Sequence, residues 1–65
     1  MRLTVNDESV ELDDGACVTD LLAKMGIAEK GIAVAVDWVV VPRSEWHEQL
    51  SYGAKVDVVA AVQGG

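Results

Sequence analysis

The chain has 65 residues, which is near the lower limit for one domain that folds without disulfides or metals. Its formal net charge of −6, with only five Lys and Arg, excludes the basic face that nucleic acids or anionic membrane surfaces require. An apolar fraction of 51% predicts a packed domain, and the single cysteine excludes an internal disulfide, so we expect a cytoplasmic protein.

The first half of the chain predicts a hairpin followed by a helix. Alternating apolar residues indicate strands at residues 2–6 and 9–13, with a turn at Asp7-Glu8. Four apolar residues then recur at helical spacing: Val18, Leu21, Leu22 and Met25. Gly26 fits the left-handed position at which helices end. A helix this short is marginal alone, so we expect it to pack against a sheet.

The second half predicts three more strands. They are expected at residues 32–36, 39–41 and 55–62, and Pro42 ends the second of them. Because a tryptophan disfavours positive φ, we expect a long or shifted turn at Asp37-Trp38 and not a tight one. Residues 43–50 predict a helical turn capped by Ser44, with Trp46 and Leu50 pointing inward, before a turn at Tyr52-Gly53.

The order of elements is therefore β-β-α-β-β-β, which indicates the α+β class. One amphipathic helix should cover one face of a single mixed sheet of about five strands. Parallel pairing of the first and last strands at the centre of this sheet is the economical way to bury both.

Few residues suggest chemistry by side chains. Cys17 could be a nucleophile assisted by His47, or a small packing residue near the start of the helix. His47-Glu48 lacks the second histidine of a zinc-protease helix, because Ser51 occupies that position. We therefore predict neither an enzyme nor a metal site.

The end of the chain suggests binding. Val58 and Ala60 can face the helix, which leaves Val59, Ala61 and Val62 as an apolar strip that is either a docking surface or part of a strand covered on both faces. Trp38 is a second candidate contact. The last residues, Gln63-Gly64-Gly65, form either a thin thread that presents a carboxylate to a partner or a frayed terminus.

The sequence resembles a known family along nearly its whole length. The most specific segments are Val-Pro-Arg-Ser-Glu-Trp at residues 41–46 and Ala-Val-Gln-Gly-Gly at residues 61–65. They resemble the sulfur carriers of thiamine biosynthesis, the ThiS family, which have the ubiquitin-like β-grasp fold. The resemblance implies a β-grasp domain at residues 1–62 and a flexible tail at residues 63–65. The family usually has a threonine cap where this chain has Cys17.

The resemblance also implies a function. An adenylating enzyme related to ubiquitin-activating enzymes would adenylate the carboxylate of Gly65, with Gly64 and Gln63 giving it access. A desulfurase system would supply the sulfur of a thiocarboxylate, which thiazole synthase would consume. The chain itself would bind no cofactor, and the partner would use ATP and Mg²⁺. A carrier for molybdopterin or for cysteine or methionine synthesis, and a non-reactive β-grasp interaction module, remain alternatives.

Overall fold

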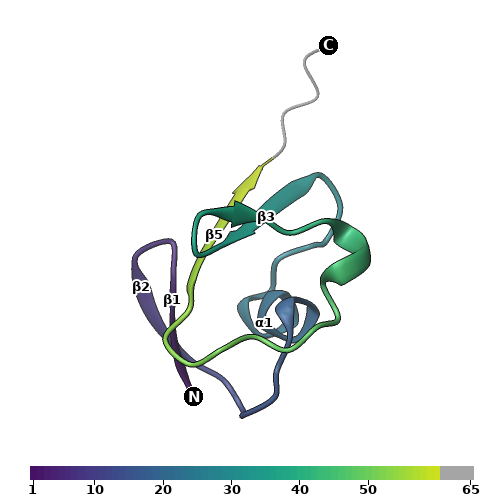
Figure 1. The fold of residues 1–65 in the computed structure, drawn as a ribbon. Coiled ribbons are helices and arrows are strands. Elements are labelled where there is room, and N and C mark those ends of the chain that lie inside the picture. The colour runs from purple at the N-terminus through teal and green to yellow at the C-terminus, as the bar shows by residue number, and fades with distance from the viewer. Residues whose placement is uncertain (61–65) are drawn as a thin grey trace.

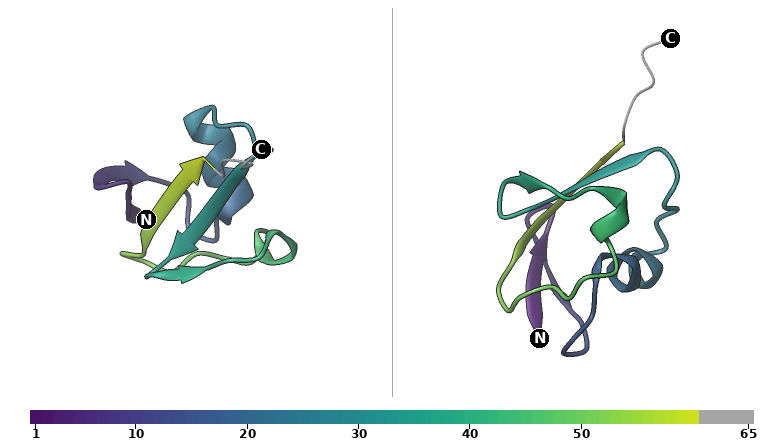
Figure 2. Two further views of the ribbon diagram at one scale, coloured as in Figure 1. Left: turned by 90° about the horizontal axis from the view of Figure 1, so that it is seen from above. Right: turned by 45° about the vertical axis from the view of Figure 1, so that its right-hand side comes forward.

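The computed structural model describes residues 1–60, which form one five-stranded sheet with a helix on one face (Figure 1; Figure 2). The elements are β1 (Arg2–Val5), β2 (Glu8–Glu11), α1 (Val18–Met25), β3 (Ile32–Val36), β4 (Val39–Val40), the 3-10 helix η1 (Arg43–Glu45) and β5 (Lys55–Ala60). No helix within this part of the chain is long and apolar enough to cross a membrane.

The strand order is β2-β1-β5-β3-β4, and the first and last strands pair in parallel at its centre. The other neighbouring strands pair antiparallel. This confirms the predicted α+β class, the mixed sheet and the parallel central pair. Since β5 lies between β1 and β3, the described chain ends on a central strand of the sheet (Figure 1).

The core forms between α1 and the alternate strand residues that face it. The buried side chains of the helix are Val18, Leu21 and Leu22. They belong to one cluster with the buried strand residues Leu3, Val5, Val34 and Val56. Gly26 ends the helix with φ 70°, as the sequence predicts. The face of the sheet that carries these residues is called the inner face below, and the opposite one the outer face.

The first hairpin turn lies one residue earlier than predicted. Val5 pairs with Glu8, so the turn consists of Asn6 and Asp7, both with positive φ. The reason is a contact distant in sequence. The side-chain amide of Asn6 donates to the carbonyl of Val58 at 3.2 Å and accepts from its N–H at 2.8 Å. These bonds fix Asn6 in the left-handed conformation that asparagine tolerates.

The prediction of a long turn at Asp37-Trp38 is wrong. Val36 pairs with Val39, and the two turn residues have φ 50° and 73°. Positive φ at both positions matches the twist of a two-residue hairpin. Two hydrogen bonds join Asp37 to the backbone of Lys55. The backbone N–H of Asp37 donates to the carbonyl of Lys55 at 2.7 Å, and the backbone N–H of Lys55 donates to Asp37 Oδ1 at 2.9 Å. These contacts offset the strain at Trp38.

The segment after Pro42 is a short 3-10 helix, and Ser44 lies inside it instead of capping it, contrary to prediction. Trp46 and Leu50 are buried as predicted. The indole Nε1 of Trp46 donates to the carbonyl of Val41 at 3.0 Å, and the Trp46 carbonyl accepts from the N–H of Thr19 at 3.3 Å. Trp46 therefore joins β4, η1 and the start of α1.

Candidate functional site

Apolar side chains gather on the outer face of the sheet, on the strands β3, β4 and β5. Val59 is 56% exposed, and its partner across the ladder is Ala33. Val40, 69% exposed, pairs with Ala35, so it points to the same face. We name Val59, Ala33, Ala35 and Val40 the outer patch. Strand alternation predicts the exposure of Val59 but not that of Val40, because β4 has only two residues and shows no period.

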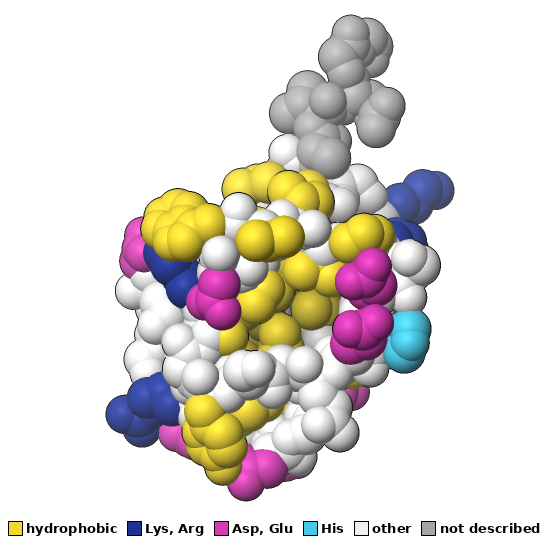
Figure 3. All heavy atoms as spheres, in the orientation of Figure 1, with side chains coloured by type: hydrophobic (Ala, Val, Ile, Leu, Met, Phe, Trp, Pro, Cys, Tyr) yellow, Lys and Arg dark blue, Asp and Glu magenta, His cyan; other side chains and the backbone are white. Residues whose placement is uncertain are grey.

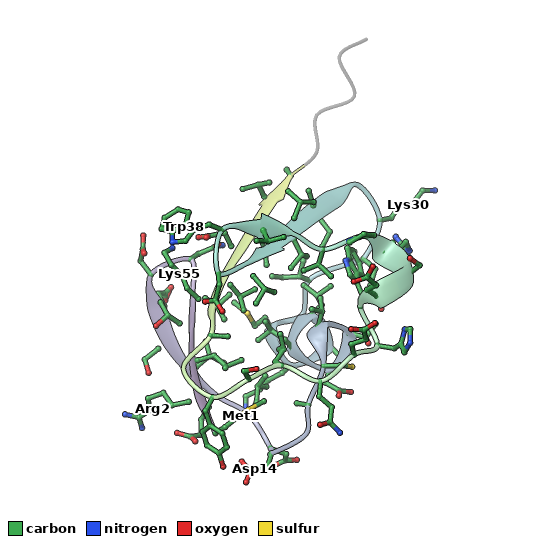
Figure 4. All side chains as sticks on the ribbon, viewed as in Figure 1. Met1, Arg2, Asp14, Lys30, Trp38 and Lys55 are labelled. Carbon is green, nitrogen blue, oxygen red and sulfur yellow. The ribbon has the colours of Figure 1, made fainter. Side chains whose placement is uncertain are left out.

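Trp38 lies beside this patch, at the tip of the β3–β4 hairpin. Its side chain is exposed, and its ring covers the ammonium of Lys55, with Nζ 4.5 Å from the ring centroid (Figure 4). Lys55 also pairs with Asp57 at 3.0 Å and with Asp7 at 3.6 Å. The hydrogen bond that the Lys55 ammonium donates to Asp57 is the main reason that the pKa of Lys55 is raised. Trp38 is thus a fixed, solvent-facing aromatic side chain.

The other predicted site residues lie outside the described residues. They are Ala61, Val62, Gln63, Gly64 and Gly65. The described part of β5 brings the chain to Ala60, next to Val59 of the outer patch.

Cys17 and His47 do not form a catalytic pair in the described structure. The thiol of Cys17 lies 2.9 Å from Thr19 Oγ1 and donates to Asp20 Oδ2 at 3.2 Å. Asp20 also accepts the backbone N–H of Cys17 at 3.0 Å, which secures the start of α1 that the thiol alone would cap poorly. His47 is exposed and is not among the hydrogen-bond partners of the thiol within residues 1–60.

The acidic residues of the first hairpin are likewise engaged in structural contacts. Glu11 and Asp14 lie 3.4 Å and 3.1 Å from the α-ammonium of Met1. A hydrogen bond from Arg2 is the main reason that the pKa of Glu11 is lowered, and one from Tyr52 is the main reason that the pKa of Asp14 is lowered. Lowered pKa values suit ion pairing and not proton transfer near neutral pH. No cluster of three or more metal-ligating side chains occurs in residues 1–60.

Asp20 gives the fold a predictable acid sensitivity. Its two hydrogen bonds from Cys17 lower the folded-state pKa below the ordinary value of 3.8, so its stabilising effect is present above that value and is lost as the pH falls through the folded pKa. We expect Asp20→Asn to lower Tm at neutral pH, and we expect the gap to wild type to close as the pH falls through the lowered folded-state pKa of Asp20.

Thermal unfolding followed by circular dichroism between neutral and acid pH checks this expectation. Glu8→Gln is the control, since Glu8 is an exposed side chain on the edge strand β2 with no ion pair among the described residues. A gap between Asp20→Asn and wild type that stays constant with pH would contradict the role given to this carboxylate.

Comparison with known proteins identifies the family to which this chain belongs. The model of the ThiS family matches residues 1–65. The chain belongs to the ThiS family. It is 26% identical to the sulfur carrier protein ThiS of Escherichia coli (strain K12), over the full length of both chains. A crystal structure of a thiamine biosynthesis protein (ThiS) from Geobacter metallireducens superposes with a TM-score of 0.84 at 26% identity, again covering both chains completely.

The comparisons confirm the family predicted from the residues. The ThiS-type match also confirms the β-grasp fold, to which the five-stranded mixed sheet and the α-helix of residues 1–60 belong. ThiS-family members are small carrier proteins and not enzymes, and they act with partner enzymes.

Proposed function

We propose that this chain carries sulfur as a thiocarboxylate on Gly65 and donates it for formation of the thiazole ring of thiamine. The observation that carries the proposal is the family match over residues 1–65, which includes the closing Gly64-Gly65. Membership of the ThiS family supports a sulfur-carrier role in thiamine biosynthesis. The thiocarboxylate and the identity of the partners are the proposed part.

The chemistry requires little from the carrier. An α-carboxylate has a pKa of about 3.5 and is ionised at neutral pH, so it can attack the α-phosphorus of ATP and release pyrophosphate. A sulfur nucleophile from a desulfurase system then attacks the acyl carbon and expels AMP, which carries away one carboxylate oxygen. When the donor is a persulfide, a thiol must reduce the remaining S–S bond to free the thiocarboxylate.

The adenylating enzyme must supply the Mg²⁺ and the positive charge that ATP needs. Glycine at positions 64 and 65 suits a reaction inside another protein, since a backbone without Cβ atoms needs the narrowest channel.

The outer patch and Trp38 are the proposed docking surface for these partners. Interface centres favour exposed apolar and aromatic side chains, and Trp38 with Val59 and Val40 supplies both kinds on one side of the sheet. Val59 is one residue from the end of the described chain, so a partner seated here would lie near the residues that lead to Gly65. Ala61 and Val62 would extend the same contact.

Intact-mass measurement tests the proposal. After incubation with ATP, Mg²⁺, a sulfur donor and the adenylating enzyme, the wild-type chain should gain the mass difference between oxygen and sulfur at Gly65. The loaded carrier should then support thiazole formation by thiazole synthase and not product formation by the large subunit of molybdopterin synthase. No gain in mass would favour a non-reactive interaction module, and the reverse preference would favour a carrier for another pathway.

A further inference from the structure

A notch opens on the inner side of the sheet, away from the outer patch (Figure 3). Its volume is about 150 Å³. Four apolar residues from separate segments line it: Val18 of α1, Val36 of β3, Val41 after β4, and Leu50. The rest of the lining is polar and comes from the end of η1 and the residues that follow it: Glu45, Glu48, Gln49 and Ser51. In Figure 3 apolar side chains form the floor of this hollow.

The notch carries uncompensated negative charge. Glu45 and Glu48 are exposed, and neither has an ion pair within residues 1–60. The one nearby cation of the same segment, Arg43, is occupied: it donates to the side chain and carbonyl of Glu29 at 3.2 and 3.1 Å and covers the ring of Trp46. No basic residue lines the notch.

The size and chemistry of the notch restrict its occupant. Sites for drug-sized ligands usually measure about 300–1,000 Å³, so this notch is too small for a nucleotide or a cofactor. An apolar floor with carboxylates in the wall fits a long side chain that has an aliphatic stem and a cationic head. Lysine and arginine have this shape, and a chain with a net charge of −6 favours a basic partner surface.

We propose that the notch receives one basic side chain of the adenylating enzyme. Its stem would contact Val36, Val41 and Leu50, and its cation would pair with Glu45 and Glu48. This inference rests on the proposed function, because it names a second contact of the same partner. It also assigns a role to the polar residues at positions 45–51, whereas Arg43 and Trp46 of the same region already hold the fold together.

One partner can reach both the notch and the outer patch. The accessible surface of the chain is 4251 Å², and a standard interface buries about 800 Å² on each partner, close to a fifth of it. A partner that embraces the edge strand β4 would meet the outer patch on one side and the notch on the other, since Val40 belongs to the patch and Val41 lines the notch.

The test compares two double variants with equal loss of charge. Glu45→Gln/Glu48→Gln removes the carboxylates of the notch. The hairpin variant, Glu8→Gln/Asp13→Asn, removes two exposed carboxylates in and just after the first hairpin. A third variant, Ser51→Phe, fills the notch without changing the charge. Association and dissociation rates for the purified adenylating enzyme are measured for each, at about 0.1 M and 0.5 M salt, together with Tm.

We expect Glu45→Gln/Glu48→Gln and Ser51→Phe each to raise Kd by about tenfold or more, mainly through faster dissociation, and the hairpin variant by less than about threefold. If the enzyme binds all variants like wild type, or if only the association rate at low salt changes, no basic side chain of the enzyme enters the notch, while the proposed function stands. If wild type neither binds the enzyme nor gains sulfur, the proposed function fails, and this inference with it. Unchanged Tm excludes unfolding as the cause.

Discussion

Deleting Gly65, or adding one residue after it, is expected to abolish sulfur loading. Either change moves the reacting carboxylate along the chain by about 3.3–3.6 Å. Attack on the α-phosphorus requires the reacting atoms to lie about 3–3.5 Å apart, and a misplacement of 1 Å already costs about 10²-fold in rate. The carboxylate itself survives in both variants, so the loss, well above 10²-fold, would come from position alone. Intact mass after incubation with ATP, a sulfur donor and the adenylating enzyme measures it.

Two controls make this result specific. Tm should stay at the wild-type value in both tail variants, because the core of residues 1–60 forms without Gly65. Cys17→Ala should load sulfur normally, since the thiol is bonded to Thr19 and Asp20 at the start of α1. Normal loading of the variant without Gly65 would refute the carrier mechanism. A large loss of loading in Cys17→Ala would instead indicate a reactive thiol.

The elements of the fold could be predicted because each has a local period. The helix follows from four apolar residues at i, i+3, i+4 and i+7, three of which the structure buries. The strand β3 follows from alternation between Ile32 and Val36. Parallel pairing of β1 with β5 followed from the need to bury both strands under one helix. These inferences use only sequence spacing and the hydrophobic effect.

The two hairpin turns could not be predicted because distant contacts stabilise them. Asn6 adopts positive φ while bonded to Val58, which is 52 residues away. Asp37 is bonded to Lys55, and Trp38 covers the same lysine. Local propensity counts the strain at Trp38 but not these bonds, so it disfavours a turn that the complete fold allows.

Part of the candidate site could likewise be predicted from the sequence, and part could not. Val59 and Trp38 could be identified as exposed candidates from alternation and from the position of the turn, although their role in docking stays a prediction. The notch could not be predicted, because Val18, Val36 and Leu50 come from three separate segments that only the fold brings together. The chemistry of Gly65 was inferred from the family resemblance and not from any period in the sequence.

Trp46→Ala is expected to unfold a large part of the population at room temperature. The side chain is only 4% exposed, and truncation of a buried aromatic residue costs about 3–5 kcal/mol. At about 0.05–0.15 kcal/mol per residue, a chain of 65 residues has a free energy of unfolding of about 3–10 kcal/mol. The substitution also removes the bond from Nε1 to the carbonyl of Val41. Urea unfolding followed by circular dichroism measures the loss.

The second tryptophan supplies a matched control. Trp38 is 78% exposed and interacts mainly with Lys55, so Trp38→Ala should cost only about 0.5–1 kcal/mol. Each variant keeps one tryptophan as a fluorescent probe: the buried Trp46 in Trp38→Ala, and the exposed Trp38 in Trp46→Ala. Trp46→Phe should fall between the two, because it retains a ring in the core but leaves the Val41 carbonyl without its donor. Equal destabilisation by Trp38→Ala and Trp46→Ala would contradict the central place of Trp46, since burial is what separates these two side chains.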